Sequence, residues 1–164
     1  PTPAWCLGNP HPPGYPLWCL LAHPFTWLPA GAVAWRVHLA SATFASAAIF
    51  LMVPLTIMLT RSRLAALTAA LTFAFSREFW EQSLIAEVYT LNALCLTLCL
   101  ILLLEWRMRR TDVWLRALAI AYGLSLANHN TMLVAGPIFA LYVLAVERPV
   151  TWRRWAASTL PTSR

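Results

Sequence analysis

The stretch AVAWRVHLASATFASAAIFLMVPLTIMLT, residues 32–60, decides the fold class. Its 29 residues would form about 43 Å of α-helix, which exceeds the roughly 30 Å hydrocarbon thickness of a bilayer. Arg36 and His38 lie near its start, where polar side chains can extend to the interface. Pro54 predicts a kink toward its far end. The stretch therefore predicts a membrane-spanning helix.

The rest of the chain is similarly apolar. Of its 164 residues, 60% are hydrophobic and 11% are charged, and the mean hydropathy is +0.63. Soluble domains carry about 25% charged residues, so the composition excludes an ordinary soluble domain. All 12 basic residues are arginine, and they stand in short runs between apolar stretches. The net charge of +6 thus indicates membrane topology and no nucleic-acid partner.

Four more apolar stretches follow, and together with the first they predict an all-α polytopic membrane helix bundle of about five crossings. They are residues 64–75, 93–104, 113–127 and 131–146. Arginine-rich turns follow the first, third and fifth apolar stretches, at 61–63, 107–110 and 148–154. The positive-inside rule assigns these turns to the cytoplasm, so the polar loops between them are extracytoplasmic.

This topology divides the chain into three parts. Residues 1–31 are the end of an extracytoplasmic loop, with a short interfacial helix at 17–27; residues 32–147 are membrane helices, and residues 148–164 are cytoplasmic. The chain begins with Pro1 and shows no signal peptide, so we expect a fragment of a longer membrane protein.

Several apolar stretches are only 12 to 16 residues long, so polar residues at their outer ends lie at membrane depth. Polar groups survive there only where protein or water surrounds them. We therefore expect an outward-facing polar cavity. Its predicted lining is Glu78, Glu81, Gln82, Glu87, Tyr89, Asn92, Asn128, His129 and Asn130.

Glu87 is the most conspicuous of these residues, because it stands at the mouth of an apolar helix. A carboxylate there is costly unless it is paired. It either positions a ligand or acts as an acid or base, or it forms an ion pair with Arg77 or Arg36. Glu78 and Glu81 share a helix face, as a second part of the site or as a solvated surface.

The tripeptide Asn128-His129-Asn130 interrupts the last apolar region. Its side chains can bind phosphate or sugar hydroxyls, or they can cap the two helix ends. One His with Asn neighbours is too few ligands for a metal, so we predict no metal site and no cofactor.

The segment GNPHPPGYPLW, residues 8–18, is stiff because proline fixes φ and lacks a backbone donor. Gly14 supplies a conformation that its neighbours disfavour. The segment either holds His11 and Tyr15 over the cavity or is a rigid linker.

The four cysteines fall into two pairs. Cys95 and Cys99 stand four residues apart in an apolar run and are expected to be buried packing residues. Cys6 and Cys19 lie in the extracytoplasmic segment, where a disulfide is an open alternative.

Four motifs in order resemble a known family. HPPGYPLW, GAVAWRVHLASA, FWEQSLIAEVYTLNAL and GLSLANHNTM are similar to the N-terminal membrane domain of a bacterial family, formerly of unknown function, that is related to a eukaryotic transmembrane protein O-mannosyltransferase. The resemblance covers residues 7–147. It implies a GT-C type integral membrane glycosyltransferase.

Such an enzyme transfers a sugar from a polyprenyl-phosphate donor to a protein, lipid or glycan acceptor outside the cytoplasm. The resemblance implies a multi-pass protein of the bacterial inner membrane. It implies Arg36, Arg77 and His129 at the phosphate, and Glu87, Tyr89 and Asn92 at the sugar or acceptor.

The resemblance also implies an acidic catalytic base ahead of HPPGYP, where this chain has no acidic residue, so the fragment alone is expected to be inactive. Two other hypotheses remain, a fragment of a membrane transporter and a non-catalytic membrane scaffold. A transporter is expected to show an inverted repeat, which is not visible here.

Overall fold

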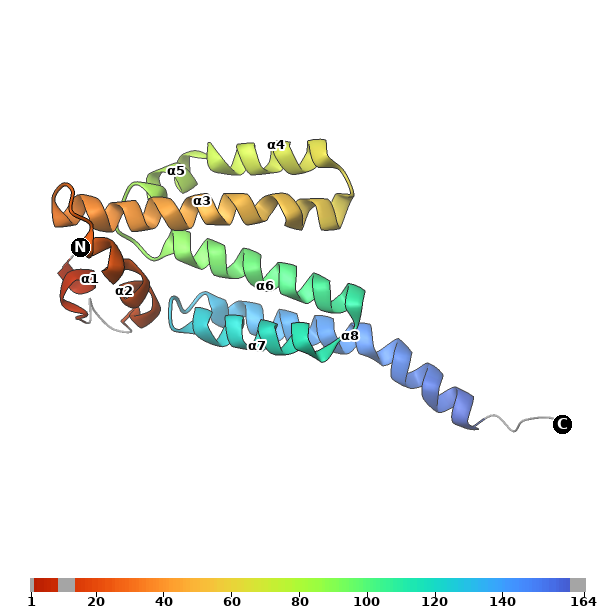
Figure 1. Ribbon diagram of the computed structural model, residues 1–164. Coiled ribbons are helices and arrows are strands. Elements are labelled where there is room, and N and C mark those ends of the chain that lie inside the picture. The colour runs from red at the N-terminus through yellow and green to blue at the C-terminus, as the bar shows by residue number, and fades with distance from the viewer. Residues whose placement is uncertain (1, 9–13, 160–164) are drawn as a thin grey trace. The chain divides into compact units, whose positions relative to one another are not determined.

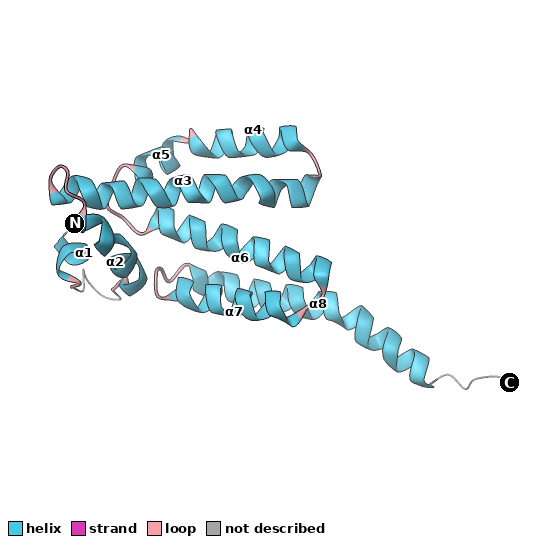
Figure 2. Cartoon of the chain, viewed as in Figure 1, coloured by secondary structure: helices cyan, strands magenta, loops and turns pink. Residues whose placement is uncertain are grey.

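The computed structural model describes residues 2–8 and 14–159, with side chains for 3–8 and 14–147. In this part of the chain every regular element is helical (Figure 2), which confirms the predicted all-α class. The elements are α1 (Thr2–Cys6), α2 (Pro16–Ala22), the 3-10 helix η1 (His23–Trp27), α3 (Val33–Thr60), α4 (Arg63–Ala74), α5 (Arg77–Ser83), α6 (Tyr89–Arg109), α7 (Asp112–Leu126) and α8 (Met132–Thr159). His11, a predicted site residue, lies outside the described residues.

The chain forms two compact units, Pro1–Met132 and Leu133–Arg164. In the first unit α3 packs against both α4 and α6, and α7 packs against the other side of α6. Figure 1 shows the resulting row of helices in the order α4, α3, α6, α7. The second unit contains the remainder of α8.

Two helices in the described part are long and apolar enough to cross a membrane, α3 and α6. Only 22% of the most apolar 18-residue window of α3 is buried, and 33% of that of α6. A core helix of a soluble protein would be mostly buried, so these exposed apolar faces fit a lipid environment. The predicted crossing at 32–60 corresponds to α3, whereas five crossings remain a prediction.

The turns of the first unit are grouped as the charge pattern predicts. Figure 1 shows the α3–α4 turn and the α6–α7 turn at one end of the unit. Each begins with an arginine in the left-handed conformation, Arg61 at φ 57° and Arg110 at φ 54°. We call this the arginine end. The opposite end, with the α5–α6 loop and the turn after α7, is called the loop end.

Helix α2, which follows the proline-rich segment, packs against the helices at the loop end. Trp18 and Cys19 of α2 are buried in one cluster with Val37 of α3 and with Val88 and Leu91 at the start of α6. The described end of the segment, from Gly14 onward, is therefore docked on the fold.

Two sequence features shape this segment. Gly14 has a φ of 74°, in the left-handed region, which agrees with the expectation of a conformation that its neighbours disfavour. The expected helix at 17–27 is found as two pieces, because helical geometry changes from α2 to η1 at His23, next to Pro24. A proline nitrogen cannot donate the hydrogen bond that would continue an α-helix.

Candidate functional site

Three segments of the first unit meet at the loop end through aromatic rings. The His129 ring lies 5.9 Å from the Tyr15 ring, centroid to centroid, with planes 5° apart. It lies 5.4 Å from the Tyr89 ring, with planes 48° apart. Tyr15 comes from the opening segment, Tyr89 begins α6 and His129 belongs to the turn after α7. The rings thus join residues that are more than 100 positions apart in the sequence.

Hydrogen bonds continue from His129 back to α6. Asn92 Nδ2 donates to Thr131 Oγ1 at 3.1 Å. Thr131 Oγ1 lies 2.9 Å from His129 Nδ1, and the Thr131 backbone N–H donates to the same nitrogen at 3.2 Å. Thr131 is not among the site residues that the sequence predicts. Its position two residues after a histidine in a tight turn is the signal that would have identified it.

Asn128 fastens the turn to the start of α6. Its side chain is 1% exposed, and its Nδ2 donates to the Val88 carbonyl at 3.2 Å. The Leu17 backbone N–H donates to the Ala127 carbonyl at 3.3 Å, which ties α2 to the same turn. Asn128 therefore links two segments instead of capping a helix.

These contacts confirm that residues 87–92 and the turn at 128–130 converge. We call the assembled side chains the aromatic–amide cluster. It consists of Tyr15, Tyr89, Asn92, Asn128, His129 and Thr131. Asn130, the remaining predicted residue of the turn, is exposed.

Glu87 lies next to this cluster, in the loop before α6. Its backbone carbonyl accepts a hydrogen bond from Ser41 Oγ at 3.4 Å, and the next residue, Val88, is the one that holds Asn128. The side chain of Glu87 is exposed. Within the described residues its carboxylate forms no ion pair, so neither Arg36 nor Arg77 neutralises it.

The side chain of Arg36 binds backbone carbonyls of the chain that precedes α3. Its guanidinium donates to the carbonyls of Thr26 at 2.7 Å, Ala30 at 2.8 Å and Gly31 at 2.9 Å. These acceptors belong to η1 and to the loop before α3. Arg36 therefore holds η1 and the loop after it against the start of α3.

We expect Arg36→Gln to destabilise the full-length protein by about 2 kcal/mol, because hydrogen bonds from a charged donor to three carbonyls are lost. The control is Arg77→Gln, which removes only an exposed ion pair with Glu81 and should cost about 0.5 kcal/mol. Thermal unfolding in detergent measures both variants. Equal losses of stability would contradict the structural role of Arg36.

The predicted site residues of α5 are arranged differently. Arg77 and Glu81 form an exposed ion pair at 2.9 Å, and Glu78 is exposed in the first turn of the helix. Phe79 packs α5 against α3, next to Ala45 and Ala48. Within the described residues, none of the α5 side chains Arg77, Glu78 and Gln82 contacts the aromatic–amide cluster through a hydrogen bond or ion pair.

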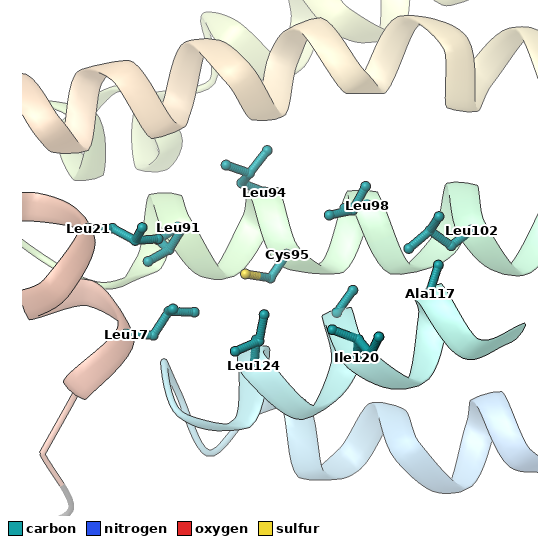
Figure 3. Close-up of a pocket in the computed structure, with 11 residues that line it drawn as sticks. Leu17, Leu21, Leu91, Leu94, Cys95, Leu98, Leu102, Ala117, Ile120 and Leu124 are labelled. Atoms are coloured by element: carbon teal, nitrogen blue, oxygen red, sulfur yellow. The ribbon is translucent and has the colours of Figure 1, made fainter. Parts of the chain in front are cut away.

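An apolar groove of about 600 Å³ follows α6 and α7 (Figure 3). At one end it is lined by Leu91, the neighbour in sequence of the cluster residue Asn92. Its lining residues are Leu17, Leu21, Leu91, Leu94, Cys95, Leu98, Leu102, Ala117, Ile120, Ala121 and Leu124. From Leu91 to Leu102 the groove extends about 17 Å along α6. We call it the α6–α7 groove.

This groove is not the predicted polar cavity, because none of the residues predicted to line that cavity lines the groove. The side-chain nitrogens of Asn92 and Asn128 are used in contacts between segments. Aliphatic side chains are left to face the space between α6 and α7.

The cysteines of the described residues are free thiols, so the Cys6–Cys19 disulfide is not formed. Cys19 is buried, its Sγ lies 3.7 Å from the Gly8 carbonyl, and burial raises the pKa of its thiol. In the same part of the chain, no group of three or more His, Cys, Asp or Glu side chains is placed to hold a metal ion.

Comparisons with known proteins identify the family. The family described as "Protein O-mannosyl-transferase TMEM260 N-terminal domain" matches residues 2–152. The curated "Protein O-mannosyl-transferase TMEM260" of Mus musculus is 36% identical over 151 residues, which is 88% of this chain and 20% of that protein. The chain thus spans about a fifth of the length of this relative. No solved structure matches. The chain belongs to the TMEM260 N-terminal domain family.

Proposed function

We propose that the protein is a GT-C type membrane glycosyltransferase, which transfers a sugar from a polyprenyl-phosphate donor to an extracytoplasmic acceptor. The mouse relative is named a protein O-mannosyl-transferase, which favours mannose as the sugar and a protein hydroxyl as the acceptor. The two apolar helices and the family together indicate a membrane protein. The observation that carries the proposal is the α6–α7 groove beginning beside the aromatic–amide cluster.

The two parts of this site match the two parts of a lipid-phosphate donor. Such a donor has a hydrocarbon tail and an anionic, hydroxyl-rich head. The aliphatic lining of the groove suits the tail. The groove is about 17 Å long, roughly half the hydrocarbon thickness of a bilayer, so a longer tail would continue into the lipid.

The cluster suits the head of the donor. Two of its side-chain carbonyl oxygens, Asn92 Oδ1 and Asn128 Oδ1, are buried without a hydrogen-bond partner in the described part of the chain. A buried acceptor without a donor is destabilising, and sugar hydroxyls supply such donors. The rings of Tyr15 and Tyr89 offer flat surfaces against which a sugar ring can pack.

The reaction is a substitution at the anomeric carbon of the sugar. The acceptor oxygen forms a bond to that carbon, and the bond from the carbon to the phosphate oxygen breaks. The phosphate leaves with the electron pair, and the acceptor hydroxyl gives its proton to a base. Hydrogen-bond donors stabilise the departing phosphate. In this proposal His129 donates a hydrogen bond to the phosphate, and the carboxylate of Glu87, which forms no ion pair within the described residues, binds the acceptor hydroxyl.

The membrane side of the site follows from the arginine turns, which the positive-inside rule assigns to the cytoplasm. Exposed tryptophans at the opposite end agree with an interface there, because Trp27 is 71%, Trp35 53% and Trp80 50% exposed. The loop end, and the cluster with it, is then extracytoplasmic.

Cysteine labelling tests this orientation in a Cys6→Ser background. A membrane-impermeant thiol reagent added to intact cells should label Ser83→Cys at the loop end. It should label Thr111→Cys, at the arginine end, only after permeabilisation. Both replacements leave every arginine in place, so the topology signal is unchanged. The opposite labelling pattern would contradict an extracytoplasmic site.

The proposed activity is tested with purified full-length protein in lipid vesicles. Polyprenyl-phosphate mannose carrying a labelled sugar is the donor, and Ser- and Thr-containing peptides are the acceptors. We expect label on the peptides. If no polyprenyl-phosphate sugar is transferred to any acceptor, the proposal fails and transport becomes the stronger hypothesis.

A further inference from the structure

The protonation of His129 can be read from its neighbours. The Thr131 backbone N–H donates to His129 Nδ1 at 3.2 Å. A backbone amide nitrogen is a donor only, so Nδ1 must be the ring nitrogen that carries the lone pair. The ring in this arrangement is neutral, and its proton is on Nε2.

Asn92 strengthens the same arrangement from α6. Its Nδ2 donates to Thr131 Oγ1 at 3.1 Å, which occupies a lone pair of that hydroxyl. The hydroxyl proton is then available for His129 Nδ1, 2.9 Å away. The Thr131 backbone N–H therefore needs the lone pair of Nδ1, and an imidazolium would lose that hydrogen bond.

The aromatic neighbours restrict how the ring can turn. Tyr15 is nearly parallel to His129, with planes 5° apart, and Tyr89 contacts it at 5.4 Å. Rotation of the imidazole would break the contact with the parallel ring as well as the bonds at Nδ1. The direction of the Nε2–H bond is thus fixed before any ligand binds.

We infer that Asn92 and Thr131 are positioning residues, which hold His129 as a neutral Nε2–H donor for the phosphate of the lipid donor. The inference rests on the proposed function. It assigns to the phosphate a hydrogen bond donated by a neutral imidazole and not by an imidazolium cation. A donor that is already oriented stabilises developing charge without reorganisation during the reaction.

Nitrogen-15 NMR of the full-length protein with labelled histidine, in nanodiscs, tests the inference. The resonance of His129 is assigned by its absence in His129→Gln. We expect a neutral ring with the proton on Nε2, and we expect a short-chain prenyl monophosphate to shift the Nε2 resonance. Inorganic phosphate at the same concentration should not shift it, since a free anion lacks the tail for the groove.

Variants separate positioning from folding. Thr131→Val removes the hydroxyl and should weaken prenyl monophosphate binding about fivefold, the effect of one net hydrogen bond. Thr131→Ser keeps the hydroxyl and should restore binding to within about twofold. Thr68→Val is the control, because Thr68 Oγ1 only donates to Leu64 of its own helix.

Two results would overturn the inference. One is a wild-type His129 that carries its proton on Nδ1 or on both nitrogens at neutral pH. The other is unchanged prenyl monophosphate binding in Thr131→Val. If both NMR expectations are met and no sugar is transferred, the positioning role stands and the proposed glycosyltransferase function fails.

Discussion

Glu87→Gln is expected to lower the turnover of the full-length enzyme by about tenfold or more, while its melting temperature stays close to that of wild type. Gln has the same shape and removes only the charge. The carboxylate is exposed and forms no ion pair within the described residues, so the fold does not depend on its charge. Transfer of labelled sugar per folded molecule, together with thermal unfolding, measures both effects.

Glu78→Gln is the matched control. Glu78 is also exposed and near the loop end, but it belongs to α5 and has no hydrogen bond or ion pair to the aromatic–amide cluster in the described part of the chain. The turnover of the Glu78→Gln enzyme should stay within about twofold of that of wild type. Normal turnover in Glu87→Gln, or a lower melting temperature with normal turnover per folded molecule, would assign Glu87 a structural role only.

Ala121→Trp is expected to raise the KM for a long-chain polyprenyl-phosphate donor by about tenfold or more. Ala121 lines the α6–α7 groove, and an indole there fills space that the donor tail needs. The loss of buried apolar contact with the tail accounts for this size, since each buried CH₂ contributes about 0.8 kcal/mol. Initial rates at varied donor concentration measure the KM.

Ala119→Trp controls for the general effect of a bulky residue on α7. Ala119 is exposed and does not line the groove, so the KM of Ala119→Trp for the long-chain donor should change little. A donor with a short tail provides a second control, because it leaves more of the groove empty and should be less sensitive to Ala121→Trp. Equal KM values for both variants and both donors would show that the tail lies elsewhere.

The sequence predicts the positions of the polar contacts well. Interruptions of apolar helices at 87–92 and 128–130 were expected to meet, and Asn128 and Tyr89 do join these segments. The reason is that polar groups in an apolar chain need partners, and the alternation of helices leaves few places to find them. The conformation of Gly14 was predictable for a different, local reason, because glycine lacks a Cβ and adopts a positive φ readily.

The residues that line the α6–α7 groove could not be predicted from the sequence. Leu94 and Leu98 stand in a run that is apolar on all sides, so the sequence does not reveal which face of α6 meets α7. In water a polar face would show the orientation of a helix, but in lipid both faces are apolar. Side-chain packing of α2, α6 and α7 decides where space remains.

Arg36 illustrates a second limit. The family resemblance implies a phosphate ligand at Arg36, and its charge makes it a candidate partner for Glu87. In the structure its guanidinium is bonded to three backbone carbonyls of the preceding loop. Backbone acceptors have no sequence signature, so a side chain that serves them is mistaken for one that serves a ligand.

The central claim is that one site holds the donor, with the sugar phosphate at the aromatic–amide cluster and the tail in the α6–α7 groove. Photocrosslinking tests it most directly, with a polyprenyl-phosphate sugar that carries a photoreactive group in the first part of its tail. The claim predicts label on peptides from residues 94–102 and 117–124, and loss of that label when unlabelled donor is added. Label confined to other helices, or label that unlabelled donor does not displace, would contradict it.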